Sequence, residues 1–389
     1  MRVLHCPDVV GGNAPALSAA QRALGATTCC VCLSSNPFGF PADETPFARR
    51  GTLRREFARW KMVWRALHEF EVIHYNFGSA LAPQRNRIRG QGWRTPKAIL
   101  YNLLYAAPLE TCDVAWAHRR GKVVAVTFQG DDARQGDVAR RLPVHFAHEV
   151  PADYYTEEGD RNVRRRIAAF DRHADLIYAL NPDLLGVLPA RARFQAYCSV
   201  DVDAWPPAPK PPVPPARLRV VHAPSHRGVK GTRHVVAAVE QLRASGLEVE
   251  LVLVENVTHA EARRIYETAD LAIDQVLAGF YGALAVELMA LEVPVVCYLR
   301  EEDLARLPPA MRAELPLINA APANLAAVLR EWLGVRRGEL HERGRRSRDF
   351  VRRWHDPRTI AQATLDDYAT ARERKHAPAR RERGEAVAA

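Results

Sequence analysis

The sequence contains no stretch of about 18 apolar residues free of charge, so no membrane-spanning helix is predicted. Its first residues, Met1–Cys6, lack the hydrophobic core of a secretory signal. The number of cysteines, seven, is odd, so they cannot all pair with one another. Together these absences favour a reducing, cytoplasmic location.

Several nucleic-acid-binding patterns are also missing. The sequence has no zinc-finger spacing, no aromatic RNA-binding signature and no heptad repeat beside a basic region. The net charge of +10 favours anionic partners, among them nucleotide diphosphates, anionic lipid headgroups and acidic glycans. Because the signatures are absent, no nucleic-acid partner is expected.

Cys29 and Cys32 have the C-x-x-C spacing of a redox or metal-binding pair. The run around them is short, apolar and rich in β-formers, and it lies where the second strand of a βαβ unit is expected. Buried strand cysteines are therefore the favoured interpretation.

Short buried strands alternate with helical patterns along the chain, which predicts an α/β fold with parallel sheets. In the first half, strands are expected over residues 2–6, 71–75, 122–128, 176–180 and 194–196, with a helix over 14–24. In the second half, strands are expected over 218–222, 248–254, 271–274 and 295–299, with helices over 232–245, 260–268 and 281–291. Helical patterning recurs over 349–370, with a break at Asp356 and Pro357.

A proline-rich run, WPPAPKPPVPP at 205–215, separates the two halves and is typical of an extended linker. We therefore expect two Rossmann-like domains that face each other across a cleft. The expected organisation is an N-terminal acceptor-binding domain (1–203), a linker (204–217), a C-terminal nucleotide-sugar-binding domain with a terminal helix (218–370) and a disordered tail (371–389).

The segment 221–232 reads VHAPSHRGVKGT and predicts a strand, a loop and the start of a helix. The loop carries Arg227 and Lys230 beside Gly228 and Gly231. Glycines let backbone N–H groups approach an anion, the helix dipole favours negative charge, and the two cations add countercharge, so the pattern suits a diphosphate. An exposed basic loop is the alternative.

A second motif, DQVLAGFYGALAVELMA at 274–290, predicts a glycine-rich turn followed by a helix. Glu287 is the one acid on that helix, among Leu, Ala, Val and Met neighbours. A charge in such surroundings needs a partner or a ligand, although a solvent-facing acid is the alternative. Asp274 is interpreted either as part of the site or as a cap at the strand end.

In this order and spacing, the motifs resemble retaining glycosyltransferases of the large family four, which have the two-Rossmann GT-B fold. The likeness covers roughly residues 1–370. It is strongest in the R-x-x-K-G loop, in ADLAID at 269–274 and in GFYG-x4-E-x-M-A at 279–290. Weaker matches are Gly11 and Gly12, TFQGDDAR at 127–134 and FVRRWHDP at 350–357.

The resemblance implies that the donor nucleotide binds to the second domain. Arg227 and Lys230 would hold the diphosphate and stabilise the charge that develops as the sugar leaves. Glu287 would accept hydrogen bonds from the ribose, and Gly12 would lie close to the phosphates. Further donor contacts are implied for Gly231, Gly279, Phe280, Tyr281, Gly282 and Ala283. No metal or other cofactor is implied, because cationic side chains and a helix N-terminus neutralise the diphosphate.

Two positions depart from the family pattern. Gly279 stands where relatives have a glutamate that faces the donor sugar. Gln129, which is expected to act in catalysis, stands where relatives often carry a histidine; glutamine can donate a hydrogen bond but cannot carry a proton at neutral pH. Retention chemistry in which the leaving phosphate deprotonates the acceptor needs no protein base.

The favoured function is transfer of a hexose from a nucleotide diphosphate sugar, preferably a UDP-sugar, to a hydroxyl acceptor in glycoconjugate, polysaccharide or metabolite synthesis. The alternative is a catalytically inactive nucleotide-sugar-binding protein. A dinucleotide oxidoreductase is a third hypothesis, but no G-x-G-x-x-G follows the first strand.

Acceptor contacts are expected at the carboxyl ends of first-domain strands, from His74, Asn76, Asp131, Asp132 and Arg134. Strand-end packing is the alternative for the first two, and loop stabilisation for the last three. The segment Gln84–Tyr105 has several cations, no acid and interleaved apolar residues. It is interpreted either as an acceptor loop that touches a phosphorylated lipid or a membrane surface, or as a solvated loop and a packed amphipathic helix.

Overall fold

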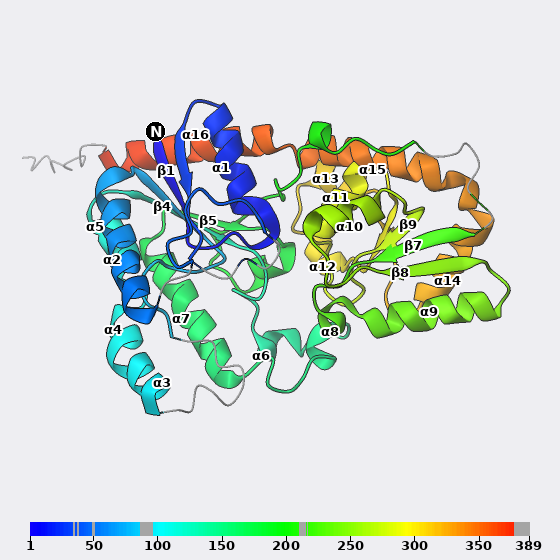
Figure 1. The fold of residues 1–389 in the computed structure, drawn as a ribbon, viewed down its shortest axis with the longest axis horizontal. Coiled ribbons are helices and arrows are strands. Elements are labelled where there is room, and N and C mark those ends of the chain that lie inside the picture. The colour runs from blue at the N-terminus through cyan, green and yellow to red at the C-terminus, as the bar shows by residue number, and fades with distance from the viewer. Residues whose placement is uncertain are drawn as a thin grey trace, which may run out of the picture.

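The computed structural model describes residues 1–33, 36, 39–48, 51–85, 96–209, 215 and 217–376. Two parallel sheets with flanking helices form two Rossmann-like units that lie side by side (Figure 1). The α/β architecture predicted from the alternating strands and helices is therefore confirmed.

The first sheet, within the described residues, has six parallel strands in the order β2-β1-β3-β4-β5-β6. They are β1 (Arg2–Cys6), β2 (Thr27–Cys30), β3 (Val72–Asn76), β4 (Val123–Phe128), β5 (Leu176–Ala179) and β6 (Arg193–Phe194). Every residue of β3 and β4 is buried, as expected for a parallel sheet covered on both faces. The strand expected over 194–196 is instead a short edge strand one residue earlier.

The helices of the first unit are α1 (Asn13–Ala23), α2 (Thr52–Glu69), α3 (Pro96–Leu100), a π-helix (Tyr101–Ala106), α4 (Ala107–Leu109), α5 (Cys112–Arg119), α6 (Gly136–Ala139) and α7 (Glu157–His173). All seven cysteines are free thiols. Cys29 and Cys30 lie on β2, and Cys30 and Cys32 are buried, so the strand interpretation of this run is confirmed.

The second sheet, within the described part of the chain, has five parallel strands in the order β11-β10-β9-β7-β8. They are β7 (Leu218–His222), β8 (Val249–Leu253), β9 (Leu271–Ile273), β10 (Val295–Cys297) and β11 (Ile318–Asn319). The helices are α8 (Arg227–Lys230), α9 (Thr232–Ala244), α10 (His259–Tyr266), α11 (Ala283–Ala290), α12 (Glu301–Leu304), α13 (Pro309–Glu314), α14 (Leu325–Arg330) and α15 (Leu340–Trp354).

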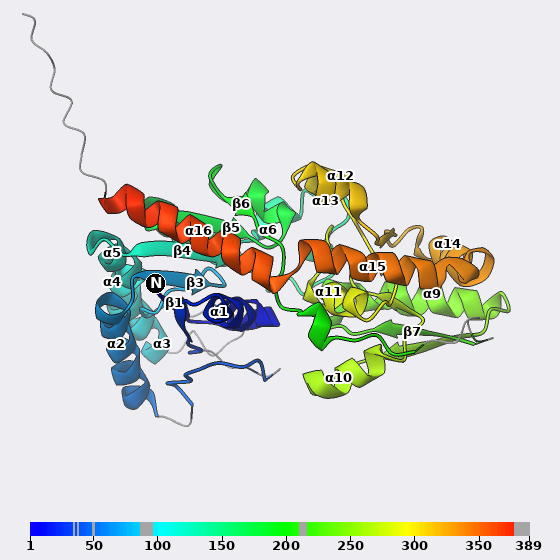
Figure 2. The same ribbon diagram turned by 90° about the horizontal axis from the view of Figure 1, so that it is seen from above.

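The last helix, α16 (Pro357–His376), leaves the second unit and packs on the first. Seen from above, α15 and α16 run one after the other across both units (Figure 2). Tyr368 of α16 is fully buried, and its hydroxyl lies 2.5 Å from Nδ1 of His74 on β3. α16 therefore packs on the first unit rather than on the second, and its helix includes residues 371–376 of the expected disordered tail. The rest of that tail, residues 377–389, lies outside the described part of the chain.

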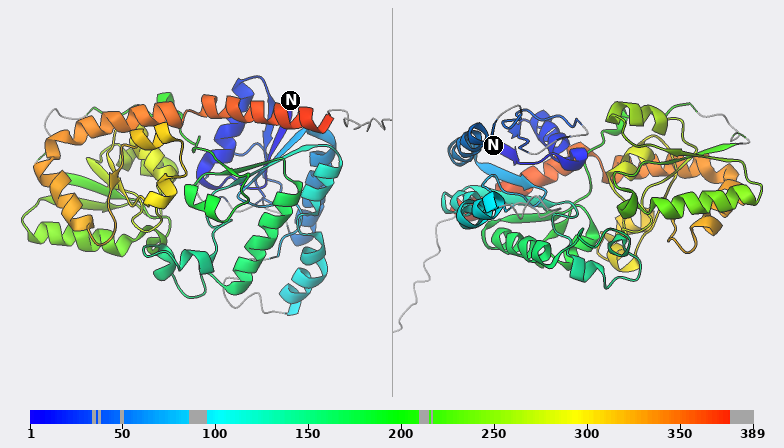
Figure 3. Two further views of the ribbon diagram at one scale, coloured as in Figure 1. Left: turned by 180° about the vertical axis from the view of Figure 1, so that it is seen from behind. Right: turned by 60° about the horizontal axis from the view of Figure 1, so that its bottom comes forward.

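A first-unit segment crosses in the other direction. Residues 136–155, which we call the bridging segment, reach the second unit near α8 (Figure 3). Phe146 is fully buried in a cluster that includes Leu218 and Val276 of the second unit. Glu149 accepts from His234 at 2.6 Å and pairs with Arg233 at 2.9 Å, both on α9. The two units are thus held together by apolar and ionic contacts.

Candidate functional site

The Lys230 ammonium is the centre of the predicted donor side. Lys230 ends the short helix α8, and its Nζ donates to Oδ1 of Asp274 at 2.8 Å and to Oε1 of Gln275 at 2.9 Å. Asp274 directly follows β9, is fully buried, and accepts the backbone N–H of Gly282 at 2.8 Å through Oδ2. One carboxylate therefore joins the cation to the N-terminus of α11.

Backbone conformation brings the two predicted motifs together. Gly231 has a φ of +74°, and a Cβ at this position would lie 2.5 Å from Val276. Only glycine lets the turn between α8 and α9 pack so closely on the loop after β9. Within that loop, the Gln275 amide donates to the carbonyl of Phe280 at 2.5 Å. A Cβ built on Gly282 would lie 3.4 Å from Nζ of Lys230, so the N-terminus of α11 lies beside this cation. The amide of Ala283, the first residue of α11, has no carbonyl four residues earlier in its own helix to accept it.

Arg227 is bound differently from Lys230. Its guanidinium pairs with Glu255 at 2.5 Å, and 64% of the side chain is exposed. The hydrogen bonds with Glu255 raise the pKa of Arg227 and lower that of Glu255. To meet a diphosphate beside Lys230, the guanidinium would have to exchange this carboxylate for a phosphate.

Glu287 is buried on α11 and has one partner that the sequence analysis did not anticipate. Its Oε1 lies 2.8 Å from Nε2 of His259, the first residue of α10. The His259 ring lies 5.7 Å from the ring of Phe40 in the first unit and 5.8 Å from Trp205. The hydrogen bond that the His259 ring donates to Glu287 raises the pKa of His259. The carboxylate expected to bind ribose therefore lies at the boundary between the units.

Gly279 adopts a backbone conformation that suits glycine alone. Its φ is +87°, and a Cβ built there would lie 2.7 Å from the guanidinium of Arg300. Arg300 is buried and held in place, because it pairs with Asp303 at 2.6 Å and donates to the carbonyl of Val144 in the bridging segment at 3.0 Å. A cation thus fills the space that a side chain at position 279 would take.

The first unit contributes Gly12 and Gln129. Gly12 precedes α1 with a φ of +70°, and a Cβ there would lie 2.9 Å from the Phe40 ring. Oε1 of Gln129 lies 3.8 Å from a Cβ built on Gly11, so the loops after β1 and β4 meet. Nε2 of Gln129 is buried and has no hydrogen-bond partner among the described residues. A buried amide donor without a partner indicates that a ligand or a water molecule binds beside it.

The cluster after β4 is occupied by internal bonds. Asp132 accepts the backbone N–H groups of Gln129 and Gly130, at 3.0 and 2.6 Å, and so shapes the loop. Asp131 accepts from the hydroxyls of two tyrosines of the bridging segment, Tyr154 and Tyr155.

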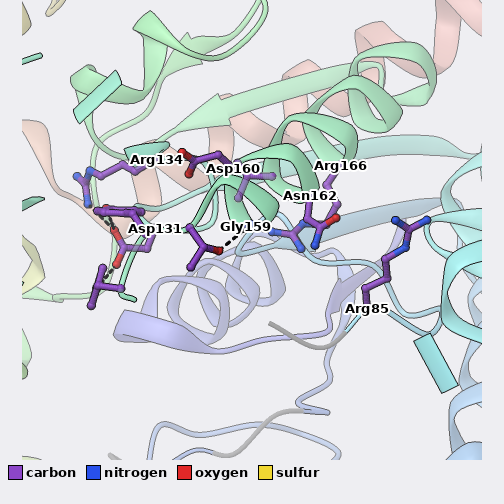
Figure 4. Close-up of a pocket in the computed structure, with 11 residues that line it drawn as sticks. Arg85, Asp131, Arg134, Gly159, Asp160, Asn162 and Arg166 are labelled. Carbon is purple, nitrogen blue, oxygen red and sulfur yellow. Dashed lines mark hydrogen bonds and ion pairs between the residues drawn. The ribbon is translucent and has the colours of Figure 1, made fainter. Parts of the chain in front are cut away.

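Arg134 pairs with Asp183 at 2.6 Å. It also lies 3.7 Å from the carboxylate of Asp131. These contacts favour loop stabilisation over direct acceptor binding for Asp132 and Arg134. Asp131 and Arg134 nevertheless line a small cavity on the first unit (Figure 4).

His74 and Asn76 lie toward the carboxyl end of β3, as expected. Both are fully buried. The two ring nitrogens of His74 lie 2.5 Å from the Tyr368 hydroxyl and 2.7 Å from the Thr127 hydroxyl. Burial lowers the pKa of His74 well below its ordinary value. The amide of Asn76 donates to the carbonyl of His74 at 3.1 Å. The two ring nitrogens of His74 are occupied by α16 and β4, which argues against the prediction that His74 contacts an acceptor. Oδ1 of Asn76 has no hydrogen-bond partner among the described residues, so acceptor contact by Asn76 stays a prediction.

Tyr281 is also part of the core rather than of a binding surface. It is fully buried, and its hydroxyl lies 3.0 Å from Nε2 of His355. Phe280 is almost as buried and contacts Phe194 at the end of β6, with ring centroids 6.2 Å apart. These rings pack the loop after β9 against the first unit, so only the backbone of this loop is left to contact a donor.

No described helix is both long and apolar enough to cross a membrane. Among the described residues, no three His, Cys, Asp or Glu side chains gather as a metal site would require.

Comparison with known proteins finds solved structures that are similar to this one, but no match to the sequence. No protein-family model matches the chain, and no curated protein does. Among solved structures, the chain is similar to sucrose-phosphate synthase from Thermosynechococcus elongatus, with a TM-score of 0.55 and 14% identity over 95% of this chain and 98% of that one. It is also similar to Anabaena Alr3699/HepE in complex with UDP and glucose, with a TM-score of 0.57 and 12% identity over 95% of this chain and 100% of that one.

A third similar structure is the catalytic domain of starch synthase IV from Arabidopsis thaliana bound to ADP and acarbose, with a TM-score of 0.54 and 11% identity over 96% of this chain and 99% of that one. The chain has the GT-B fold. At these identities, the likeness shows the fold alone. The predicted fold class is confirmed, and the roles of individual residues remain predictions.

Sequence reasoning missed several residues of the candidate site. Gln275 lies within a quoted motif beside Asp274, which the sequence analysis did consider, and its place directly after a buried strand was the available signal. His259, Phe40 and Arg300 carried none, because they reach the site from elements distant in the sequence.

Replacing Gly279 by Ala is expected to lower the free energy of unfolding more than replacing Gly25 by Ala. Both glycines have a positive φ, +87° and +91°, but nothing lies within 4 Å of a Cβ at Gly25. The left-handed backbone alone costs about 1–2 kcal/mol at each position, and crowding against Arg300 adds about 1–3 kcal/mol at Gly279. Urea denaturation of both variants measures the difference; equal losses would show that Arg300 does not confine position 279.

The His259–Glu287 pair predicts a pH-dependent stability. Because the folded protein raises the pKa of His259, the protonated ring stabilises the fold fully below the unfolded value of 6.5. This contribution is lost as pH rises through the raised pKa. His259→Gln should therefore lower the melting temperature most near pH 5.5–6 and progressively less toward pH 8.5. A difference from wild type that stays constant over this range would contradict the pairing.

Proposed function

We propose that this chain is a retaining glycosyltransferase that moves a hexose from a nucleotide diphosphate sugar to a hydroxyl acceptor. The observation that carries the proposal is the Lys230–Asp274–Gly282 arrangement, which sets an oriented ammonium beside the amides that begin α11. A cation and a helix N-terminus at one point make a site for a diphosphate. This local geometry supports the proposal independently of the fold, which hosts many functions.

In the proposed reaction, the bond between the sugar C1 and the diphosphate oxygen breaks, and the electron pair stays on that oxygen. Lys230 and the α11 amides stabilise the charge of the leaving diphosphate, so no metal ion is required. The acceptor oxygen bonds to C1 on the same face, and its proton passes to the leaving phosphate. Glu287 accepts hydrogen bonds from the ribose hydroxyls.

Gln129 would donate a hydrogen bond from its Nε2 to the donor sugar. Its amide is buried at the meeting of the β1 and β4 loops. Asp132 fixes the backbone of Gln129, and Asn181 donates to the carbonyl of Gln129 at 2.5 Å. These two bonds fix the backbone from which the Gln129 side chain extends. Gly12 would bring the backbone of the neighbouring loop close to the phosphates.

A uridine nucleotide is the proposed donor. Two similar structures, HepE and an α-glucosyltransferase, are complexes with UDP, whereas starch synthase IV is bound to ADP. The α-glucosyltransferase and starch synthase IV are enzymes by name, which does not favour the alternative of an inactive nucleotide-sugar-binding protein.

The acceptor would bind to the first unit. The protein would act in the cytoplasm.

We also propose that Gln84–Tyr105 touches a membrane surface. Residues 86–95 lie outside the described part of the chain, so this proposal rests on the segment that follows. There, α3 and the π-helix expose four large apolar side chains, Ile99, Leu100, Leu103 and Leu104. Apolar side chains on one exposed helical segment suit an interfacial contact.

UDP should stabilise the protein against heat, because a ligand bound to the native state adds about 2.7 kcal/mol at one hundred times its Kd. Lys230→Ala should weaken UDP binding by at least about tenfold, the effect of losing a charged hydrogen bond. Thermal shift titrations with UDP measure both.

The matched control is Lys61→Ala, which removes an exposed lysine of α2. Because Lys230→Ala leaves Asp274 without its cation, each variant is compared with its own nucleotide-free melting temperature. No stabilisation of the wild type by UDP or by any other nucleoside diphosphate would overturn the proposed function.

A further inference from the structure

A groove on the first unit lies between α2 and α5, which pack against each other. Its volume is about 470 Å³. Three tryptophans, Trp60, Trp64 and Trp116, line the groove together with Arg119 and Arg120. No aspartate or glutamate is among the described residues that line it. The groove therefore combines an aromatic wall with positive charge.

Neither arginine of the groove is ion-paired with a carboxylate of the described chain. Both are exposed, and the side chain of Arg119 has no hydrogen-bond partner among the described residues. Arg120 donates to Nε2 of His68 at 2.9 Å, while Nδ1 of His68 lies 2.7 Å from the carbonyl of Trp64. Because a guanidinium only donates and a carbonyl only accepts, this ring donates from Nδ1 and is neutral. Both positive charges are thus left for an anion.

Helix α2 exposes apolar side chains along the face that carries Trp64. Leu53, Phe57 and Trp64 are all exposed, Phe57 by 73% and Trp64 by 56%. Intervals of four and seven residues place them on one face of a helix. Lys61, which is also exposed, lies on the same face four residues after Phe57. Exposed apolar residues that adjoin one another mark an interaction surface, whereas scattered ones do not.

The π-helix adjoins α2. The hydroxyl of Tyr105 accepts from the Trp60 indole at 2.7 Å and donates to Glu56 at 2.9 Å. Leu103 and Leu104, which precede Tyr105, are exposed as well. Figure 1 and Figure 2 show α2, α3, α4 and α5 gathered on the side of the first unit that faces away from the second unit. The groove therefore belongs to a broader apolar surface at this end of the molecule.

The residues of the groove match the parts of an anionic phospholipid. An acyl chain is apolar and can lie against the indoles, and a phosphate has acceptor oxygens for two guanidinium groups. Tryptophan is enriched where proteins meet the headgroup level of a bilayer, and lysines there extend their ammonium groups toward the headgroups. A second copy of this chain fits less well, because a symmetric contact through this face would join two grooves of the same charge.

We propose that the groove between α2 and α5 binds an anionic phospholipid of a bilayer. An acyl chain lies against the three indoles, and the phosphate binds to Arg119 and Arg120. The inference goes beyond the proposed function, because α2 and α5 take no part in donor binding. It also differs from the membrane contact proposed for Gln84–Tyr105, since no residue that lines the groove belongs to that segment.

Vesicle flotation with the full chain tests the proposal. At about 0.1 M salt, vesicles of phosphatidylcholine with about 30% phosphatidylglycerol should bind the protein at least about tenfold more strongly than vesicles of phosphatidylcholine alone, because anionic headgroups attract the unpaired cations. Salt at about 0.5 M should remove most of this preference, since it screens exposed charges.

The double variant Arg119→Gln/Arg120→Gln should weaken binding to the anionic vesicles by about 25-fold, or about fivefold for each cation lost near the bilayer surface. The matched control is Arg264→Gln/Arg346→Gln, which removes the same net charge from exposed positions on α10 and α15 of the second unit. The control should bind like the wild type. All four arginines are exposed, so these substitutions should leave the fold intact.

Trp64→Ser should weaken binding to the same vesicles by about tenfold, because an apolar side chain no longer leaves water on docking. Val335→Ser is its control, since Val335 is 90% exposed but lies in the second unit. Leu103→Ser/Leu104→Ser examines the neighbouring π-helix separately from the groove.

Equal binding to both kinds of vesicle, or to neither, overturns the inference. So does binding that Leu103→Ser/Leu104→Ser abolishes while the arginine pair and Trp64→Ser leave it unchanged; the membrane contact of Gln84–Tyr105 would then stand without the groove. A dimer in solution that Trp64→Ser dissociates, with no vesicle binding, would show that a second copy covers this face. Stabilisation by UDP should be the same in every one of these variants, so its failure in the wild type contradicts the proposed function and leaves the groove untouched.

Discussion

The Asp274 carboxylate is the group on which the proposed donor side depends. It is fully buried, and its two oxygens hold the Lys230 ammonium and the N–H that begins α11. Losing one partner of a buried ion pair costs about 3–5 kcal/mol, because the other charge is left unpaired. The same carboxylate orients the cation and the helix N-terminus, so the stability of this loop and its suitability for a diphosphate have one physical origin.

The second constraint is the exchange of segments between the two units. The bridging segment buries Phe146 in the second unit, and α16 returns Tyr368 to the first. As a result, Arg300 of the second unit is bonded to Val144 of the first, and Phe40 of the first contacts His259 of the second. The loops proposed to bind donor and acceptor are therefore positioned by packing on both sides of the boundary.

The sequence predicted the parts of the fold that follow from local patterns. Strands such as Leu218–His222 were placed correctly because a short apolar run between turn residues suffices to define a buried parallel strand. The paths of α16 and the bridging segment were not predicted, because they depend on packing between distant residues. For the same reason His74 was assigned to an acceptor surface: nothing near it in sequence indicates that Tyr368 covers it.

The most direct test of the account is an experimental structure of the protein with UDP bound. We expect the diphosphate to contact Lys230 and the first-turn amides of α11, and the ribose hydroxyls to donate to Glu287, with the Lys230–Asp274 contact retained. A diphosphate bound away from Lys230, or a ribose that does not contact Glu287, would contradict the central claim that this arrangement is the donor site.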